Sequence, residues 1–305
     1  MNSVTTLPRV LFDVADLHSD DVAKLLARAS DLAAGARPAD RLDKRTVALF
    51  FAQPSTRTRV GFAAAVARLG GSAIDVTGPK FQDGMDGPES LADTARVLDD
   101  YCDIVVVRHS CEAAVREFAA AAEVPVINAG AGKIAHPTQA LVDLFAIRQQ
   151  FGRVTGLRVG IAGDLSTSRT GRSLFRALAR LEPVEIRLMA PADRHWSAEK
   201  IGNASARVTR EDDLIVEGLD VLYVAGMPPG VGDDVLPLDV RKRFYVDREC
   251  LSRMSPSAIV LCALPRTGDI DPAADDDPRA CYFQQSAHGL FVRMALLEAY
   301  AGWLP

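Results

Sequence analysis

The chain has 305 residues, which is enough for about two domains of ordinary size, each with its own hydrophobic core. Hydrophobic residues make up 48% and charged residues 25% of the sequence, and the net charge of -5 argues against a general nucleic-acid-binding protein. No run approaches about 18 consecutive apolar residues and the first residues lack the pattern of a secretory signal, so we expect a cytoplasmic protein without a membrane span.

Short apolar runs alternate with segments of helical periodicity through the first half of the chain. The pattern predicts, in chain order, helix 20–34, strand 46–51, helix 57–69, strand 72–76, helix 89–100, strand 103–108, helix 112–122, strand 125–128 and helix 137–150. Strands that alternate with helices are typical of parallel sheets covered by helices on both faces.

A second series of the same kind begins after residue 156. It predicts strand 157–162, helix 169–181, strands 185–190, 206–210, 220–225 and 258–264, and a last helix at 289–302. The two series indicate two α/β domains, joined through the helix at 137–150.

Polar side chains follow five of the predicted strands. Ligands of open α/β sheets bind outside the carboxyl ends of the strands, so a site is expected at these positions. The groups are Ser55 to Arg59, Arg108 with His109, His136 to Gln139, Asp164 to Arg169, and Leu264 to Arg266. Five such groups at equivalent places favour a convergent site over surface accidents.

The stretch PSTRTRVGF, residues 54–62, places three hydroxyls and two guanidinium groups between a predicted strand and a predicted helix. A simple helix cap needs only one Ser or Thr. Free N–H groups at a helix start, with hydroxyls and an arginine, form a cradle for an anion, and phosphate suits it best because phosphate accepts hydrogen bonds from many directions. The alternative is a cap with exposed arginines.

Four further residues are candidates for the same site. His136, before Pro137 at a helix start, is either structural or a donor to a carbonyl oxygen, and Gln139 one turn later reaches the same ligand. Arg108 ends an apolar strand and is either paired with a carboxylate or aimed at a ligand. Arg169 follows GDLSTS and again indicates an anion site.

Several other patterns argue against alternative chemistries. GAGK at 130–133 fails the spacing of a phosphate loop, and Gly160 and Gly163 do not complete a dinucleotide fingerprint. The five cysteines contain no CxxC pair, which argues against a zinc cluster or a disulfide framework. The acidic stretch 269–277 is predicted to be a solvated turn.

At these residues the sequence resembles the aspartate/ornithine transcarbamoylase superfamily along nearly its whole length. The motifs that carry the resemblance are STRTR (55–59), ESLADTARVL (89–98), VVVRH (105–109), NAGAGKIAHPTQALVDLF (128–145), GDLSTSRTGRS (163–173), ALPR (263–266) and YFQQSAHGLFVRMALL (282–297). The HPTQ and YFQQ segments are similar to the aspartate branch, and the HCLP signature of the ornithine branch is absent.

The resemblance implies a fold of two doubly wound parallel-sheet domains whose C-terminal helix returns to the first domain. Residues 1–140 with 288–305 then bind carbamoyl phosphate, and residues 141–287 bind the amine or amino-acid acceptor. It also implies a homotrimer with active sites shared at subunit interfaces, and neither a metal nor an organic cofactor.

The resemblance also implies a role for each candidate residue. The phosphate is held by Ser55, Thr56, Arg57 and Thr58, and Arg108 bridges the phosphate and the carbonyl oxygen. His136 donates to that oxygen, and the carbamoyl nitrogen is held by Gln139 and by the backbone carbonyls of Leu264 and Pro265. Arg169 holds the α-carboxylate of the acceptor. Arg57, Thr58, Arg108 and His136 are the catalytic candidates, because they would stabilise the oxyanion and the departing phosphate.

The acceptor half departs from the family pattern. Gly226 stands where the aspartate branch has an arginine for the side-chain carboxylate, and Pro228 where it has a glutamine. In the loop before ESLADT, Asp83 stands near a family serine and Asp86 near a family lysine, while Lys80 lies too early in the loop. A buried carboxylate without its partner is costly.

We therefore expect a carbamoyltransferase whose acceptor is an amino acid other than aspartate, with at most one carboxylate. One alternative is an ordinary aspartate carbamoyltransferase of pyrimidine biosynthesis that makes N-carbamoyl-aspartate. Another is a catalytically weak paralogue that acts as a partner-binding subunit.

Overall fold

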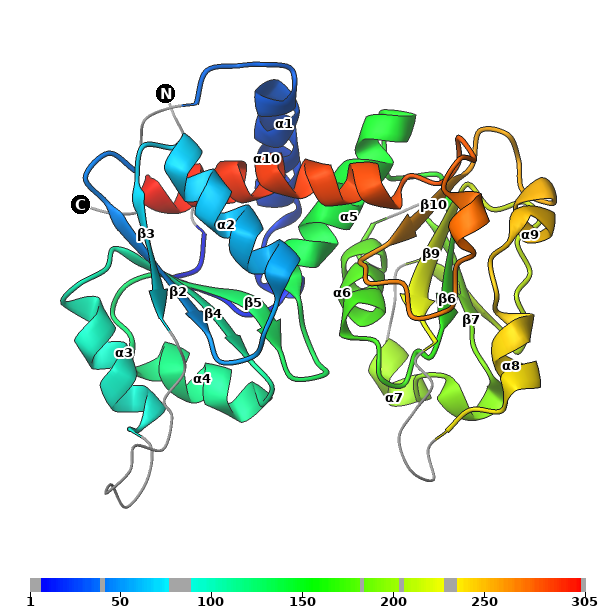
Figure 1. Ribbon diagram of the computed structural model, residues 1–305, viewed down its shortest axis with the longest axis horizontal. Helices are drawn as coiled ribbons and strands as arrows, with labels where there is room; N and C mark the ends of the chain where they lie inside the picture. The colour runs from blue at the N-terminus through cyan, green and yellow to red at the C-terminus, as the bar shows by residue number, and fades with distance from the viewer. Residues whose placement is uncertain are drawn as a thin grey trace. The chain divides into compact units, whose positions relative to one another are not determined.

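The computed structural model describes residues 7–38, 42–76, 89–181, 184–202, 206–227 and 235–302. The chain divides into two compact units, residues 1–145 with 288–305 and residues 146–287. Each unit contains a five-stranded parallel sheet with helices on both faces (Figure 1). This is the class of two parallel-sheet α/β domains that the alternating pattern predicted.

The first unit is built on the sheet order β1-β5-β4-β2-β3. Its elements are β1 (Val10–Leu11), α1 (Ser19–Ala33), β2 (Thr46–Phe51), α2 (Thr56–Arg68), β3 (Ser72–Val76), α3 (Leu91–Asp99), β4 (Ile104–His109), α4 (Glu112–Ala121) and β5 (Val126–Ala131), followed by α5 (Pro137–Phe151), which crosses into the second unit. The central strands β2 and β4 are buried on both faces, which explains their continuous apolar runs.

Helices α3 and α4 cover one face of this sheet, where Phe50 and Val105 of the strands pack with Leu98 and Phe118 of the helices (Figure 1). The C-terminal helix α10 (Tyr282–Ala301) belongs to the first unit from His288 on. Glu298 of α10 pairs with Arg28 of α1 at 2.5 Å, and the Tyr300 hydroxyl donates to the carbonyl oxygen of Pro8 at 2.9 Å. The predicted return of the last helix is confirmed.

The second unit has the sheet order β10-β9-β6-β7-β8. Its elements are β6 (Arg158–Gly163), α6 (Arg169–Leu178), β7 (Glu185–Met189), α7 (Ala198–Ile201), β8 (Arg207–Glu211), β9 (Val221–Gly226), α8 (Leu238–Arg243), α9 (Arg248–Ser252) and β10 (Ile259–Cys262). Helix α6 lies so close to the sheet that a Cβ on Gly171 would be 3.2 Å from Ala225. Leu251 of α9 packs with Leu222 and Val260 in a core cluster of the same unit.

The strand order reverses once in each sheet. In the first unit the reversal lies between β2 and β4, and in the second between β6 and β9. Such reversal points open a crevice at the carboxyl ends of the two strands, and ligands of α/β proteins bind there. The two reversal points therefore mark where a site should be sought.

The structure differs from the sequence-based prediction in several places. The short elements β1, α7, α8 and α9 were not predicted, and α10 begins at Tyr282 rather than at 289, because the polar run QQSAHG hides its helical pattern. The prediction of a solvated turn at 269–277 is wrong for Asp269, which is 2% exposed because its carboxylate accepts the Thr267 N–H at 2.6 Å. Within the described ranges, every helix is too short or too polar to cross a membrane.

Candidate active site

The N-terminus of α2 follows directly on β2 at the reversal point of the first sheet. Ser55 is its N-cap residue, yet the Ser55 side chain makes no capping hydrogen bond, and the first turn holds no acidic residue. The N–H groups of a first helical turn have no partner within the helix and carry partial positive charge. This helix end therefore offers an uncapped anion-binding position with the hydroxyls of Ser55, Thr56 and Thr58 beside it.

Arg108 lies on the other side of the same reversal point. It pairs with Phe51 in the register of β2 and β4, and its carbonyl oxygen accepts the N–H of Ala52 at 3.0 Å. The Arg108 side chain is 8% exposed and donates from Nη1 to the carbonyl oxygen of Ala129 at 3.0 Å. The guanidinium is thereby held at the carboxyl edge of the sheet, next to the chain that leads into α2.

The turn after β5 brings His136 to the edge that follows the same three strands. Gly132, at a φ of +49°, donates its N–H to the carbonyl oxygen of His109 at 3.0 Å and ties this turn to the end of β4. His136 is 4% exposed, and the Thr138 hydroxyl lies 3.3 Å from its Nδ1. When that hydroxyl donates to Nδ1, the proton of the neutral ring is on Nε2, and Nε2 can then donate a hydrogen bond to a ligand.

Gln139 is oriented by a neighbour on its own helix. Its Nε2 donates to Oδ1 of Asp143, one turn later on α5, at 2.7 Å. Asp143 is fully buried. Because the amide nitrogen is engaged in this way, the Gln139 oxygen is the end of the amide that faces other partners, and it accepts N–H donors.

The reversal point of the second sheet carries Arg169. Ser168 is the N-cap of α6; its hydroxyl oxygen accepts the Gly171 N–H at 3.2 Å and donates to the carbonyl oxygen of Ala225 at 3.0 Å. Arg169 is the first residue of this helix, and burial lowers the pKa of its guanidinium from the ordinary range. A partly desolvated guanidinium attracts a carboxylate more strongly than an exposed one.

Gly226 ends β9 on the opposite side of this point. Its φ of +94° lies in the region that favours glycine, and its carbonyl oxygen accepts the Asp164 N–H at 2.8 Å. Of the atoms of the described residues, only the Thr267 hydroxyl would lie within 4 Å of a Cβ placed on Gly226, at 3.9 Å. Thr267 is therefore the described neighbour that faces Gly226.

A buried carboxylate adjoins Thr267. The Thr267 N–H donates to Oδ1 of Asp269, whose Oδ2 is buried and has no hydrogen-bond partner among the described residues. Sequence reasoning missed both residues, because nothing in the acidic stretch distinguishes one buried aspartate from its exposed neighbours.

The predicted site residues thus fall into two groups, one in each unit. Ser55, Thr56, Arg57, Thr58, Arg108, His136 and Gln139 lie in the first unit, and Arg169, Gly226, Leu264 and Pro265 lie in the second. Leu264 and Pro265, in the loop after β10, therefore share a unit with the acceptor candidates rather than with the other donor-side candidates. Lys80, Asp83, Asp86 and Pro228 lie outside the described residues.

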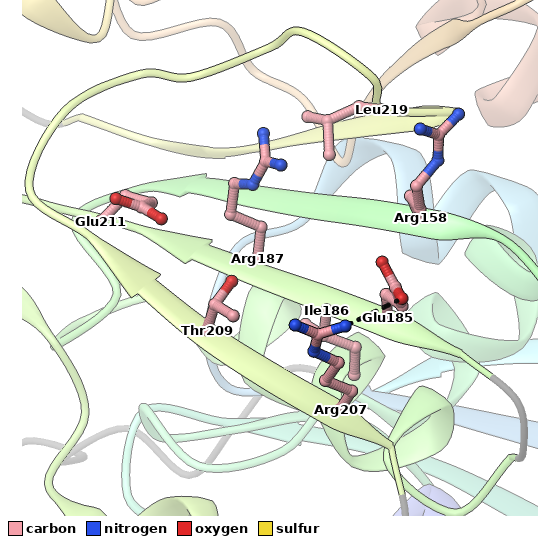
Figure 2. Close-up of a pocket in the computed structure, with 8 residues that line it drawn as sticks. All are labelled: Arg158, Glu185, Ile186, Arg187, Arg207, Thr209, Glu211 and Leu219. Atoms are coloured by element: carbon pink, nitrogen blue, oxygen red, sulfur yellow. Dashed lines mark ion pairs between the residues drawn. The ribbon is translucent and has the colours of Figure 1, made fainter.

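A cavity of about 170 Å³ lies on the second sheet, away from these groups (Figure 2). Arg158, Glu185 and Arg207 stand side by side at the amino ends of β6, β7 and β8, and Arg207 pairs with Glu185 at 3.5 Å. Arg187 donates from Nη1 to the carbonyl oxygens of Ile215 and Glu217. Its guanidinium thus ties the loop at residues 215–217 to the sheet. The residues that line this cavity include none of the predicted site residues.

Comparison with known proteins identifies a family for both parts of the chain. Residues 9–149 match the family model described as the aspartate/ornithine carbamoyltransferase carbamoyl-P binding domain, and residues 155–300 match the Asp/Orn binding domain of the same family. The chain is 38% identical over 292 residues to the aspartate carbamoyltransferase catalytic subunit of Methanopyrus kandleri, covering 93% of this chain and 91% of that one.

Two solved structures show the same fold. The catalytic subunit of M. jannaschii aspartate transcarbamoylase superposes with a TM-score of 0.86 at 35% identity, over 95% of this chain and 97% of that one. Aspartate transcarbamoylase from Trypanosoma cruzi, in complex with carbamoyl aspartate and phosphate, superposes with a TM-score of 0.84 at 30% identity, over 97% of each chain.

Proposed function

The chain belongs to the aspartate/ornithine carbamoyltransferase family, so it is a carbamoyltransferase, and we propose that it transfers the carbamoyl group of carbamoyl phosphate to the amino group of aspartate. The observation that supports carbamoyl phosphate as the carbamoyl donor is the uncapped start of α2, which lies beside the buried Arg108 at the reversal point of the first sheet. The relatives named aspartate carbamoyltransferase support the choice of acceptor.

Five side chains and the start of α2 bind the donor in this proposal. Ser55, Thr56, Arg57 and Thr58 hold the phosphate with the first-turn N–H groups. Arg108 bridges the phosphate and the carbonyl oxygen. The start of α2 suits an anion, because its first turn carries no acidic residue that would compete for the N–H groups.

The carbamoyl group is held from its two ends. His136 donates from Nε2 to the carbonyl oxygen, which the Thr138 contact with Nδ1 favours. The Gln139 oxygen accepts from the carbamoyl nitrogen, and the carbonyl oxygens of Leu264 and Pro265 take its other N–H. The contact between Gln139 and Asp143 supports this orientation of the amide.

Transfer then proceeds by addition and elimination. The neutral amine forms a C–N bond to the carbonyl carbon, and the developing oxyanion is stabilised by Thr58, Arg108 and His136, each such donor being worth roughly 3–4 kcal/mol. The C–O bond to phosphate breaks, phosphate leaves with the electron pair, and the amine proton passes to it. Arg169 holds the α-carboxylate of the acceptor, which orients the amine.

A second candidate acceptor is an amino acid with one carboxylate and a neutral or cationic side chain. The specific observation in its favour is Gly226, which presents no side chain and has a φ that an arginine rarely adopts. The buried Asp269 carboxylate near Thr267 adds negative charge to the same region. Both features disfavour a second carboxylate on the acceptor.

The two candidates are separated by a panel assay. The protein is incubated with carbamoyl phosphate and, separately, with aspartate, asparagine and a diamino acid; phosphate release and product mass are followed. Aspartate as the best acceptor supports the first candidate, and asparagine or the diamino acid supports the second. If the protein binds carbamoyl phosphate but releases phosphate with none of these acceptors, the result supports the remaining alternative, a catalytically weak paralogue that acts as a partner-binding subunit.

We also propose a homotrimer. Among its described residues, the first unit exposes four large apolar side chains, Val60, Ile74, Val97 and Tyr101, and an interface with neighbouring copies would remove them from water. The family resemblance assigns a neighbour's loop to each active site, and an assembly of this kind would also shield these side chains.

A further inference from the structure

The spacing of two residues in α10 has a structural consequence that the proposed chemistry does not use. Arg293 lies four residues after Gly289, and its side chain folds back across that glycine: a Cβ on Gly289 would be 2.4 Å from Arg293 Nη1. A Cβ on Gly61 of α2 would be 2.7 Å from the same atom. The two glycines therefore form a slot between α10 and α2 that accommodates the guanidinium.

The guanidinium in this slot is buried, and none of the described residues supplies a counter-charge. Arg293 is 5% exposed, and burial lowers the pKa of its guanidinium to about 10, so the group stays charged at neutral pH. Its Nε has no hydrogen-bond partner, and no carboxylate pairs with it among the described residues. Its one contact with a π system is the Phe62 ring, 5.5 Å from the guanidinium carbon.

Packing alone does not account for a charge at this place. A methionine would fill a slot between two glycines without the desolvation cost of a buried cation, and replacing buried charges by apolar residues often stabilises proteins. Buried charges in proteins are ordinarily paired, and an uncompensated one is strongly destabilising, so a partner is expected. The partner should be an anion that binds close to the slot.

The start of α2 is the nearest candidate position for such an anion. Gly61 lies one turn after Arg57, and Phe62 one turn after Thr58, so the slot adjoins the side of α2 that bears both residues. The rise of a helix places Gly61 about 7.5 Å along the axis from Thr56. A charge in a dry interior acts over such a distance, because little solvent screens it.

We propose that Arg293 is a positioning residue for the phosphate group, whose buried charge favours the dianion at the start of α2 through space and without contact. The inference rests on the proposed function, since it takes the start of α2 as the phosphate site. It assigns a role to the G-x-x-x-R spacing at 289–293, with Gly289 and Gly61 holding the slot open.

The experiment measures binding of inorganic phosphate by calorimetry to the wild-type protein and to Arg293→Met, Arg293→Lys and Arg68→Met. Arg68 is exposed at the end of α2 and controls for the loss of one charge from the same helix. Titrations at about pH 8.5 and about pH 5 compare the dianion of inorganic phosphate with its monoanion, because they lie on either side of its second pKa.

We expect Arg293→Met to weaken binding of the dianion about tenfold and of the monoanion about threefold, because a Coulomb energy is proportional to the ligand charge. Arg293→Lys and Arg68→Met should stay within about threefold of the wild type at both pH values. A structural role would predict equal effects of Met and Lys and an equal loss for both charge states, and that outcome overturns the inference, as does unchanged binding by Arg293→Met.

Two further comparisons keep the test decisive. If Arg293→Met does not fold, Arg293→Gln retains a polar amide in the slot and makes the same comparison. If the wild type binds no phosphate, or Arg57→Ala binds it as well as the wild type, the phosphate site at α2 is refuted. If Arg57→Ala weakens binding and the neutral Arg293 variants do not, the role of Arg293 alone is refuted.

Discussion

Gly163 and Gly226 meet backbone to backbone at the reversal point of the second sheet: a Cβ on Gly163 would stand 2.4 Å from the carbonyl oxygen of Gly226. Both residues have positive φ, +134° and +94°. The close approach lets the Asp164 N–H reach the Gly226 carbonyl at 2.8 Å, and Asp164 begins the turn that leads to Arg169. The geometry of the acceptor-side residues therefore depends on two glycines.

The variant Gly163→Ala tests this dependence. The added methyl clashes with backbone that has little room to move, and the φ is strained for alanine, so we expect a loss of roughly 2–4 kcal/mol in the free energy of unfolding. Gly152→Ala is the matched control: its φ is +71° but nothing lies within 4 Å, so only about 1 kcal/mol should be lost. Equal melting temperatures of the two variants would contradict the close approach.

Removal of the Arg57 side chain should weaken carbamoyl phosphate binding in the absence of any acceptor. A hydrogen bond to a charged group is worth about 1.5–3 kcal/mol, so Arg57→Ala should lower the affinity roughly ten- to a hundredfold in calorimetry. Arg59→Ala is the control, because Arg59 is exposed and already paired with Asp75 at 2.6 Å. An unchanged affinity in Arg57→Ala would sink the assignment of the phosphate cradle.

Stability should fall as the pH drops below about 6.5, in part because of His288. Its ring packs edge-on against Phe145 at 5.2 Å between centroids, Nδ1 is buried without a partner, and burial lowers its pKa from the ordinary 6.5. Between that value and the lower folded pKa, the unfolded chain binds more protons than the folded chain. The free energy of unfolding therefore decreases as the pH falls through this window.

The variant His288→Asn removes the titrating ring and should flatten this pH dependence in melting curves between about pH 7 and pH 5. Phe145→Leu is the comparison: it keeps the titrating ring but removes part of what buries it, so it lowers stability and should retain more of the wild-type slope than His288→Asn does. A His288→Asn protein with the wild-type slope would show that other groups account for the acid sensitivity.

The assembly is tested by sedimentation at working enzyme concentrations. We expect a trimer, with activity per chain that falls on dilution as the trimer dissociates, because each site would need a neighbouring chain. Ile74→Lys, on the exposed edge strand β3, places a charge on one of the exposed apolar positions and probes whether β3 lies in the contact. A stable monomer with full activity excludes shared sites.

Local patterns were enough to predict most of the fold and one half of the site. Continuous apolar runs and helical periods of 3.6 residues are read from neighbouring residues, and they located β2, β4 and α2 to within a residue or two. The grouping of polar residues after strands identified Ser55 to Thr58, Arg108 and His136, because every parallel strand delivers its carboxyl end to the same edge. The short helices α7, α8 and α9 span too few residues for any period to emerge.

The sequence by itself determined the α/β class, the order of the strands along the chain and the residue types at the strand ends, since these depend on interactions between near neighbours. Only the tertiary structure decided that Arg293 enters a slot beside Gly61, that Asp269 is buried against Thr267, and that Gly163 meets Gly226. Each of these depends on which distant segments pack together. Burial, and with it the cost of an unpaired charge, is a property of that packing and has no signature in a local run of residues.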